Sequence, residues 1–307
     1  MPVIGRSLAN LYPSHRNRAN AQPISWEHRA GDWTSDLMLY IATVHYKSPQ
    51  WIEIQTRYLR EHVSVPYQTW TSLEHIDPSF SVHFDRVLEQ RGSHAGKLNN
   101  LAMEIAEEAS DDDLLMFLDG DAFPIADPMP LIDRALGSAP LLAVRRAENV
   151  NEPQPHPCFC VTTVGTWRSL PGDWTSGPTW PGPGGARVGD VGGNLLRRLE
   201  LTQTPWEQVL RSNRTDVDPL YFAIYGDTIY HHGAGFRTGE LSPVDRAALP
   251  QSLPLSPVPG LRTLTRLVNR LKWRSWERGT EKRHVRESRA IFEKIQRGGT
   301  DWLADFM

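Results

Sequence analysis

The sequence lacks the usual marks of a membrane-spanning, secreted or disulfide-stabilised protein. No apolar run among its 307 residues approaches the about 20 that a helix needs to cross a bilayer. Residues 1–29 carry no apolar signal-peptide core, so we expect a cytoplasmic protein. The only two cysteines, Cys158 and Cys160, lie two residues apart in a strand-like run, where geometry disfavours a disulfide. We expect both to be free thiols in the core.

The chain also has no internal repeat and no glycine-rich phosphate loop after its first expected strand. Its hydrophobic content of 39% and charged content of 22% are typical of a globular protein. The net charge of −3 is unevenly distributed, because residues 261–307 carry +6 and the remainder −9. No nucleic-acid partner is expected, and the basic C-terminal segment indicates an attachment or interaction surface.

The main chemical signal lies between Asp111 and Pro124. Five apolar residues run directly into Asp119-Gly120-Asp121. Such a run is typical of a strand buried on both faces, and open α/β sheets bind ligands at the carboxyl ends of their strands. Two carboxylates this close raise each other's pKa unless a cation accompanies them. The pattern predicts a site for Mg²⁺ or Mn²⁺ and a diphosphate; a solvated Asp-Gly turn is the alternative.

The alternation of patterns predicts a doubly wound α/β sheet. Strands are expected at 37–44, 67–71, 114–118 and 141–144, and helices at 50–62, 95–109 and 127–136. Further along the chain, the sequence predicts a strand at 158–164, a helix at 192–200 and strand-like runs within 221–230. The Gly/Pro-rich segment 171–185 has the length of a lid or binding loop.

Residues 36–237 resemble a GT-A type nucleotide-sugar-dependent glycosyltransferase, similar to the bacterial family 2 members. The resemblance rests on the α/β first half, the Asp119-Gly120-Asp121 signature, an acidic residue before a later helix, and a histidine after the last core strand. It implies a GT-A (Rossmann-like) mixed sheet flanked by helices. It also implies hexosyl transfer from a UDP- or GDP-linked sugar with Mn²⁺ or Mg²⁺.

The same resemblance implies an organisation along the chain. An N-terminal arm (1–30) would precede a catalytic domain (31–245), divided into a nucleotide-sugar half (31–125) and an acceptor half (126–245). A linker (246–260) and a basic amphipathic helical tail (261–307) would follow.

The resemblance assigns roles around the cation. Asp121 would be a direct ligand, and Asp119 would contact the ribose or the metal. His231 or His232 would supply a further ligand, and strand alternation lets only one of them face the site. We favour His232, because Gly233 follows it and permits close approach of the backbone. Packing of either histidine in the strand is the alternative.

Other residues would hold the donor. Arg237 is expected to clamp the diphosphate, because guanidinium groups match phosphate oxygens. His94 and Lys97 lie near a helix start, where backbone N–H groups favour anions; a capping histidine and a surface lysine are the alternatives. The base and ribose are expected beside three residues after the first strand, Thr43, His45 and Tyr46.

Asp190, ahead of Gly192-Gly193, resembles the acidic acceptor residue of the family. It would take the proton from the attacking hydroxyl in an inverting reaction; helix capping is the alternative. The Glu-Asp pair common in inverting members is absent, since Gly189 precedes it. His156 and Trp167 are candidates for lining the acceptor site. The acceptor itself, a glycan, a lipid-linked sugar or a small molecule, is not indicated.

Three other functions are compatible with parts of the sequence. A haloacid-dehalogenase-like phosphatase also uses an Asp-x-Asp after a buried strand, but near the first strand of its domain. A nucleotidyltransferase would need the phosphate loop that is absent here. The basic tail would fit a non-catalytic module that binds a membrane or a partner. Its leucines follow helical spacing from Leu261, so we expect an amphipathic helix that docks on anionic lipid, packs on the domain or forms a dimer.

Overall fold

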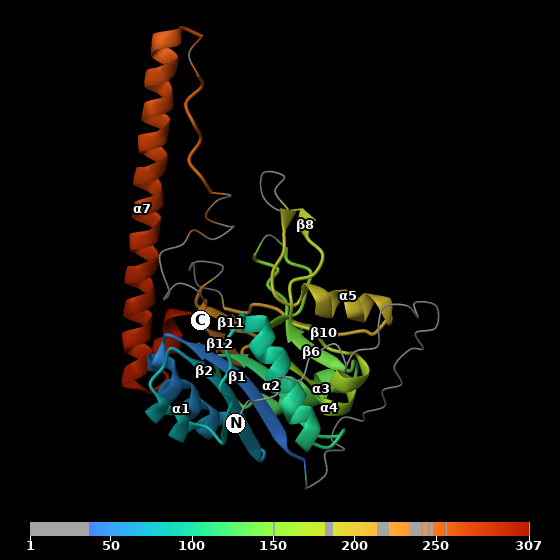
Figure 1. The fold of residues 1–307 in the computed structure, drawn as a ribbon. Coiled ribbons are helices and arrows are strands. Elements are labelled where there is room, and N and C mark those ends of the chain that lie inside the picture. Colours follow the sequence, from blue (N-terminus) through green and yellow to red (C-terminus); the bar gives the residue numbers. More distant parts are fainter. Residues whose placement is uncertain are drawn as a thin grey trace, which may run out of the picture.

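A computed structural model describes residues 37–149, 151–181, 187–213, 221–233, 241, 245, 248–255 and 257–306. It is a mixed α/β structure with a central sheet flanked by helices and a long C-terminal helix (Figure 1). The strand order of the central sheet is β10-β6-β7-β4-β1-β2-β3. These strands are β1 (Leu39–Tyr46), β2 (Tyr67–Glu74), β3 (Arg86–Val87), β4 (Leu114–Asp119), β6 (Leu141–Val144), β7 (His156–Thr163) and β10 (Glu207–Val209). The expected fold class is confirmed.

Most neighbouring strands of this sheet are parallel, and only β7 runs against its neighbours β4 and β6. Two smaller sheets accompany it. Their strands are β5 (Ala122–Pro124), β11 (Ala223–Tyr225) and β12 (Ile229–His231) in one, and β8 (Trp180–Pro181) and β9 (Arg187–Val188) in the other. Because β5 follows β4 after a single turn, the small β11-β12-β5 sheet lies at the carboxyl end of β4.

Strand β4 is buried on both faces, as its continuous apolar sequence predicts. Leu114, Met116 and Leu118 join one core cluster, with side chains from α1 (Ile52–His62) and α3 (Met129–Leu136). Leu115 and Phe117 join the opposite cluster, with α2 (His94–Glu108), α4 (Val164–Ser169) and α5 (Gly193–Leu201). The helices therefore cover both faces of the sheet.

The described residues also include short 3-10 helices at Pro49–Trp51, Pro78–His83 and Asp301–Asp305. Both cysteines are buried and free, as expected. None of the helices in the described part of the chain is long and apolar enough to span a membrane.

The C-terminal helix α7 (Pro259–Arg297) has two different halves. Its inner half, residues 277–297, packs on the domain: Phe292 and Ile295 enter a third core cluster with Trp51, Tyr58 and Phe123. Its outer half, residues 259–276, projects beyond the rest of the molecule (Figure 1). The expected tail helix is thus present, beginning two residues before Leu261.

Candidate functional site

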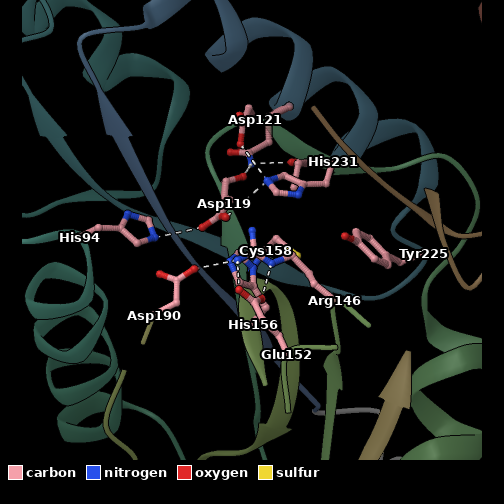
Figure 2. Close-up of polar contacts among 12 residues, drawn as sticks. His94, Asp119, Asp121, Arg146, Glu152, His156, Cys158, Asp190, Tyr225 and His231 are labelled. Atoms are coloured by element: carbon pink, nitrogen blue, oxygen red, sulfur yellow. Dashed lines mark hydrogen bonds and ion pairs between the residues drawn. The ribbon is translucent and has the colours of Figure 1, made fainter. Parts of the chain in front are cut away.

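Two carboxylates and one imidazole converge at the carboxyl end of β4. Asp119 ends β4, Gly120 makes the turn, and Asp121 precedes β5. Strand β12 pairs with β5 in antiparallel register, so that His231 lies opposite Ala122. Nε2 of His231 is 3.5 Å from Oδ2 of Asp119 and 3.5 Å from Oδ1 of Asp121 (Figure 2). The pairing of β12 with β5 thus places His231 beside the two aspartates, although they are distant in the sequence.

The chemistry of this cluster fits a divalent cation. The ligand atoms of Asp119, Asp121 and His231 all lie within 4.8 Å of one another. The 3.5 Å separations are long for hydrogen bonds. Among the described residues, Nδ1 of His231 has no hydrogen-bond partner, although it is buried. Carboxylate oxygens with one imidazole nitrogen suit Mg²⁺ or Mn²⁺.

Histidines keep Asp119 ionised. Burial alone would raise the pKa of this carboxyl, but the hydrogen bond with His94 and the nearby imidazoles of His156 and His231 hold it well below its usual range. Nε2 of His94 is 3.0 Å from Oδ1 of Asp119. His94 is the first residue of α2, and the preceding Ser93 caps that helix through Gly96 N–H. The alternative of a capping histidine is wrong, because Ser93 caps the helix and His94 binds the aspartate.

The turn between the aspartates has no space for a side chain. A Cβ at Gly120 would lie 2.6 Å from the carbonyl oxygen of Val44 and 2.7 Å from Nδ1 of His45. The end of β1 therefore packs directly against the turn. A cleft lies beside this contact, and its lining residues are Val44, His45, Tyr46, Ser48, Trp51, Gly120 and Asp121.

Gln55 of α1 links β1 to the turn. Its amide nitrogen donates to the carbonyl oxygens of Asp119, at 2.8 Å, and Ala122, at 2.7 Å. Its amide oxygen accepts from Thr43 Oγ1 at 3.2 Å and lies 3.1 Å from His45 Nε2. Burial lowers the pKa of His45 to about 4, so that its ring is neutral at pH 7. Thr43 supports the turn and does not line the cleft, whereas His45 and Tyr46 do line it.

Lys97 is engaged with a neighbouring strand. Its side chain is 3% exposed and forms an ion pair with Glu74 at the end of β2. Its ammonium also lies 5.3 Å from the ring centre of Tyr46. Lys97 is therefore not a surface lysine, which was the alternative, and its charge is already balanced by Glu74; the contact with the donor stays a prediction. The Lys97 ammonium therefore contacts the ring of Tyr46, which lines the cleft.

The structure reverses our preference between the two histidines. His232 is fully buried, with Nδ1 2.9 Å from the Tyr230 hydroxyl and Nε2 2.6 Å from Ser288 Oγ of α7. Its backbone N–H donates to the carbonyl oxygen of Asp121. Alternation along β12 turns His231 toward the carboxylates and His232 away from them. Arg237 lies outside the described residues.

Asp190 is held by an arginine that sequence reasoning missed. Nη2 of Arg146 donates to Oδ2 of Asp190 at 2.7 Å, and Arg146 also binds both carboxylate oxygens of Glu152, at 2.9 and 3.2 Å (Figure 2). Asp190 makes no helix cap, since Gly192 occupies that position of α5 with φ +85°. Figure 2 shows Asp190 on the same side of the site as His94. Its side chain is 39% exposed and accessible to a ligand.

A signal for Arg146 was present in the sequence. It closely follows the buried strand β6, which runs in the same direction as β4, since both oppose β7. Its side chain could therefore be expected at the same edge of the sheet.

Of the two acceptor-side candidates, His156 lies near His231, with ring centres 6.0 Å apart. Trp167 instead packs in the core against Phe117 and Trp174.

Neither a family model nor a curated protein matches the chain. Solved glycosyltransferase structures match parts of it. The apo form of GlyE from Streptococcus pneumoniae TIGR4 is 14% identical over 44% of this chain and 36% of its own, with a TM-score of 0.33. The galactosyltransferase LgtC, in complex with donor and acceptor sugar analogues, is 12% identical over 42% of this chain and 59% of its own, with a TM-score of 0.30. TarS of S. aureus is 9% identical over 45% of this chain and 30% of its own, with a TM-score of 0.34. The chain spans less than two thirds of the length of each of these proteins.

Proposed function

We propose that the protein is a metal-dependent glycosyltransferase of the GT-A type that uses a nucleoside-diphosphate sugar. The observation that carries the proposal is the convergence of Asp119, Asp121 and His231 at the carboxyl edge of the sheet. A cleft lined by the end of β1 adjoins this cluster. A cation site next to a cleft fits a diphosphate leaving group, and Tyr46 lines that cleft.

Asp119, Asp121 and His231 would hold Mn²⁺ or Mg²⁺. When bound, the ion supplies charge neutralisation for the departing nucleoside diphosphate. His94 keeps Asp119 ionised and oriented. Gln55 fixes the backbone of the turn, so that the two carboxylates keep their relative positions.

Asp190 would act as the general base of an inverting transfer. Its partly exposed carboxylate accepts the proton of the acceptor hydroxyl as that oxygen attacks the sugar. Arg146 positions Asp190 through one charged hydrogen bond and leaves its second oxygen to the backbone of Val191 and to the acceptor. The acceptor would be a compound that places a hydroxyl group beside Asp190.

The phosphatase alternative is not favoured by the geometry. In such an enzyme the first aspartate is the nucleophile and must point freely toward the phosphate. Here Asp119 is hydrogen-bonded to His94 and 12% exposed at its side chain. Hydrolysis of p-nitrophenyl phosphate without any nucleotide would reopen this alternative.

Calorimetry of UDP and GDP binding, with and without Mn²⁺, tests the donor site. The Asp121→Asn variant is expected to lose the manganese-dependent part of the binding. Asp112→Asn is a matched control, because Asp112 is an exposed aspartate in the turn before β4. Unchanged affinity of Asp121→Asn for both nucleotides would contradict the assignment. Asp190→Asn should keep donor binding and lose transfer, and full turnover by this variant would exclude its role as base.

A further inference from the structure

The outer half of α7 presents an apolar face that nothing in the described structure covers. Leu261, Leu264, Leu267, Val268 and Leu271 are each at least 40% exposed. The extended segment 248–255 runs alongside, held by hydrogen bonds between Leu253 and Asn269. It bonds the side of the helix that carries Asn269, and its own Leu253 and Leu255 are exposed. The leucine-bearing side of α7 stands clear of the domain (Figure 1).

The apolar side chains are gathered on one side of the helix. At about 100° per residue, the five residues from Leu261 to Leu271 fall within an arc of roughly 120°. Lys272 borders this arc on one side and Arg274 on the other. The remaining circumference carries Arg262, Arg266 and Arg270. No aspartate or glutamate occurs from residue 246 to residue 276.

The inner half of the same helix is different. Its buried side chains follow a stripe against the domain, formed by Thr280, His284, Ser288, Phe292 and Ile295. Its exposed surface mixes both signs of charge, with Glu287 and Glu293 among the basic residues and Glu281 half-buried. The acid-free composition is thus confined to the part of α7 that projects, while the inner half fixes that part to the domain.

We propose that the outer half of α7 docks on the surface of an anionic lipid bilayer. An amphipathic helix with a basic polar face lies in the interface, with its apolar side among the acyl chains and its cations at the phosphates. A second copy of this chain is a poorer occupant. It would bring another five Lys and Arg side chains against the same five, with no carboxylate from either segment to balance them.

Vesicle co-sedimentation of the full chain tests the proposal. Phosphatidylcholine vesicles containing about one third phosphatidylglycerol should bind the protein at least about tenfold more strongly than pure phosphatidylcholine. Raising the salt concentration to about 0.5 M should weaken this binding. Leu264→Asp/Leu271→Asp should lower it by about tenfold or more, because both charges enter the apolar arc.

A matched variant separates docking from a general effect of added charge. Val82→Asp/Leu201→Asp makes the same chemical change at exposed sites in the 3-10 helix Pro78–His83 and in α5, 82% and 60% exposed, and should leave vesicle binding unchanged. The proposal is overturned if the wild-type protein does not sediment with anionic vesicles, or if both double variants lose binding equally. It is also overturned if light scattering shows a dimer that only Leu264→Asp/Leu271→Asp dissociates. Because the assay contains no nucleotide or acceptor, its result is independent of glycosyl transfer.

Discussion

Replacing Arg146 should expose how the acceptor side of the site is built. Arg146 is the cation between Glu152, whose side chain is 1% exposed, and the more accessible Asp190. Burial raises the pKa of Glu152 to about 7, even though Arg146 acts in the opposite direction. The Arg146→Met variant keeps most of the side-chain volume but leaves a buried carboxyl without its partner.

The structure gives the size of the effect. Arg146 makes two hydrogen bonds to Glu152, each worth about 1.5–3 kcal/mol as a charged hydrogen bond. Breaking a buried ion pair by removing one partner costs about 3–5 kcal/mol. We therefore expect Arg146→Met to lower the free energy of unfolding by about 4 kcal/mol at neutral pH. Asp190→Asn disturbs only a partly exposed contact and should cost at most about 1 kcal/mol.

The pH dependence provides an independent check. In Arg146→Met the folded protein should hold the proton of Glu152 more tightly than the unfolded chain does. Its stability then falls as the pH rises above the unfolded pKa. The wild-type protein, whose Glu152 has a pKa of about 7, falls in the same way up to about pH 7, so the deficit of the variant should widen above about pH 7 and be smaller at about pH 5 than at about pH 8. Arg146→Met/Glu152→Leu should recover part of the loss, because no buried charge remains.

Urea unfolding followed by tryptophan fluorescence, at about pH 5 and about pH 8, measures all four proteins. The reasoning is refuted if Arg146→Met is no less stable than Asp190→Asn. It is equally refuted if its deficit is the same at both pH values.

Three further predictions concern the turn and its supports. Gly120→Ala should lower the free energy of unfolding by at least about 2 kcal/mol and abolish manganese-dependent nucleotide binding, because the new methyl group meets Val44 and His45. Gly279→Ala, at a helical position with open space around it, is the control. Equal stability of the two variants would contradict the close packing at Gly120. Burial lowers the pKa of His232 to about 3, so the free energy of unfolding of the wild-type protein falls by about 1.4 kcal/mol per pH unit through this group as the pH drops below about 6.5. In His232→Gln, the free energy of unfolding measured in urea should depend less steeply on pH between about pH 6 and about pH 4. An unchanged pH dependence would show that His232 does not titrate in this way. Chelation by EDTA should abolish UDP or GDP binding, added Mn²⁺ should restore it, and binding that is indifferent to both would exclude a metal-held diphosphate.

Local sequence patterns were sufficient for much of this architecture. The apolar run of β4 and the two aspartates after it predict a buried strand ending at a ligand-binding edge, and the structure has that strand. Helix α2 begins one residue before its expected start, and β6 has its expected bounds. These features depend on periodicity and turn chemistry within a short window, which the sequence displays directly.

The parts that escaped prediction depend on register and on distant pairing. Which of His231 and His232 faces Asp121 is fixed by the pairing of β12 with the three-residue strand β5, and a shift of one residue would exchange them. Arg146 and Asp190 are 44 residues apart in the sequence. No local pattern brings them together.

Helix α7 connects the candidate site with the exposed apolar face. Its inner half contributes Phe292 to a cluster with Trp51, whose ring centre is 4.9 Å from that of Phe292 and 4.5 Å from that of His232. Trp51 also lines the cleft beside Asp121. Deleting the helix from Gly260 onward would therefore uncover the back of the candidate site as well as remove the apolar face. Point substitutions in the outer half leave this packing intact, and only they can separate attachment to a lipid surface from the chemistry of the site.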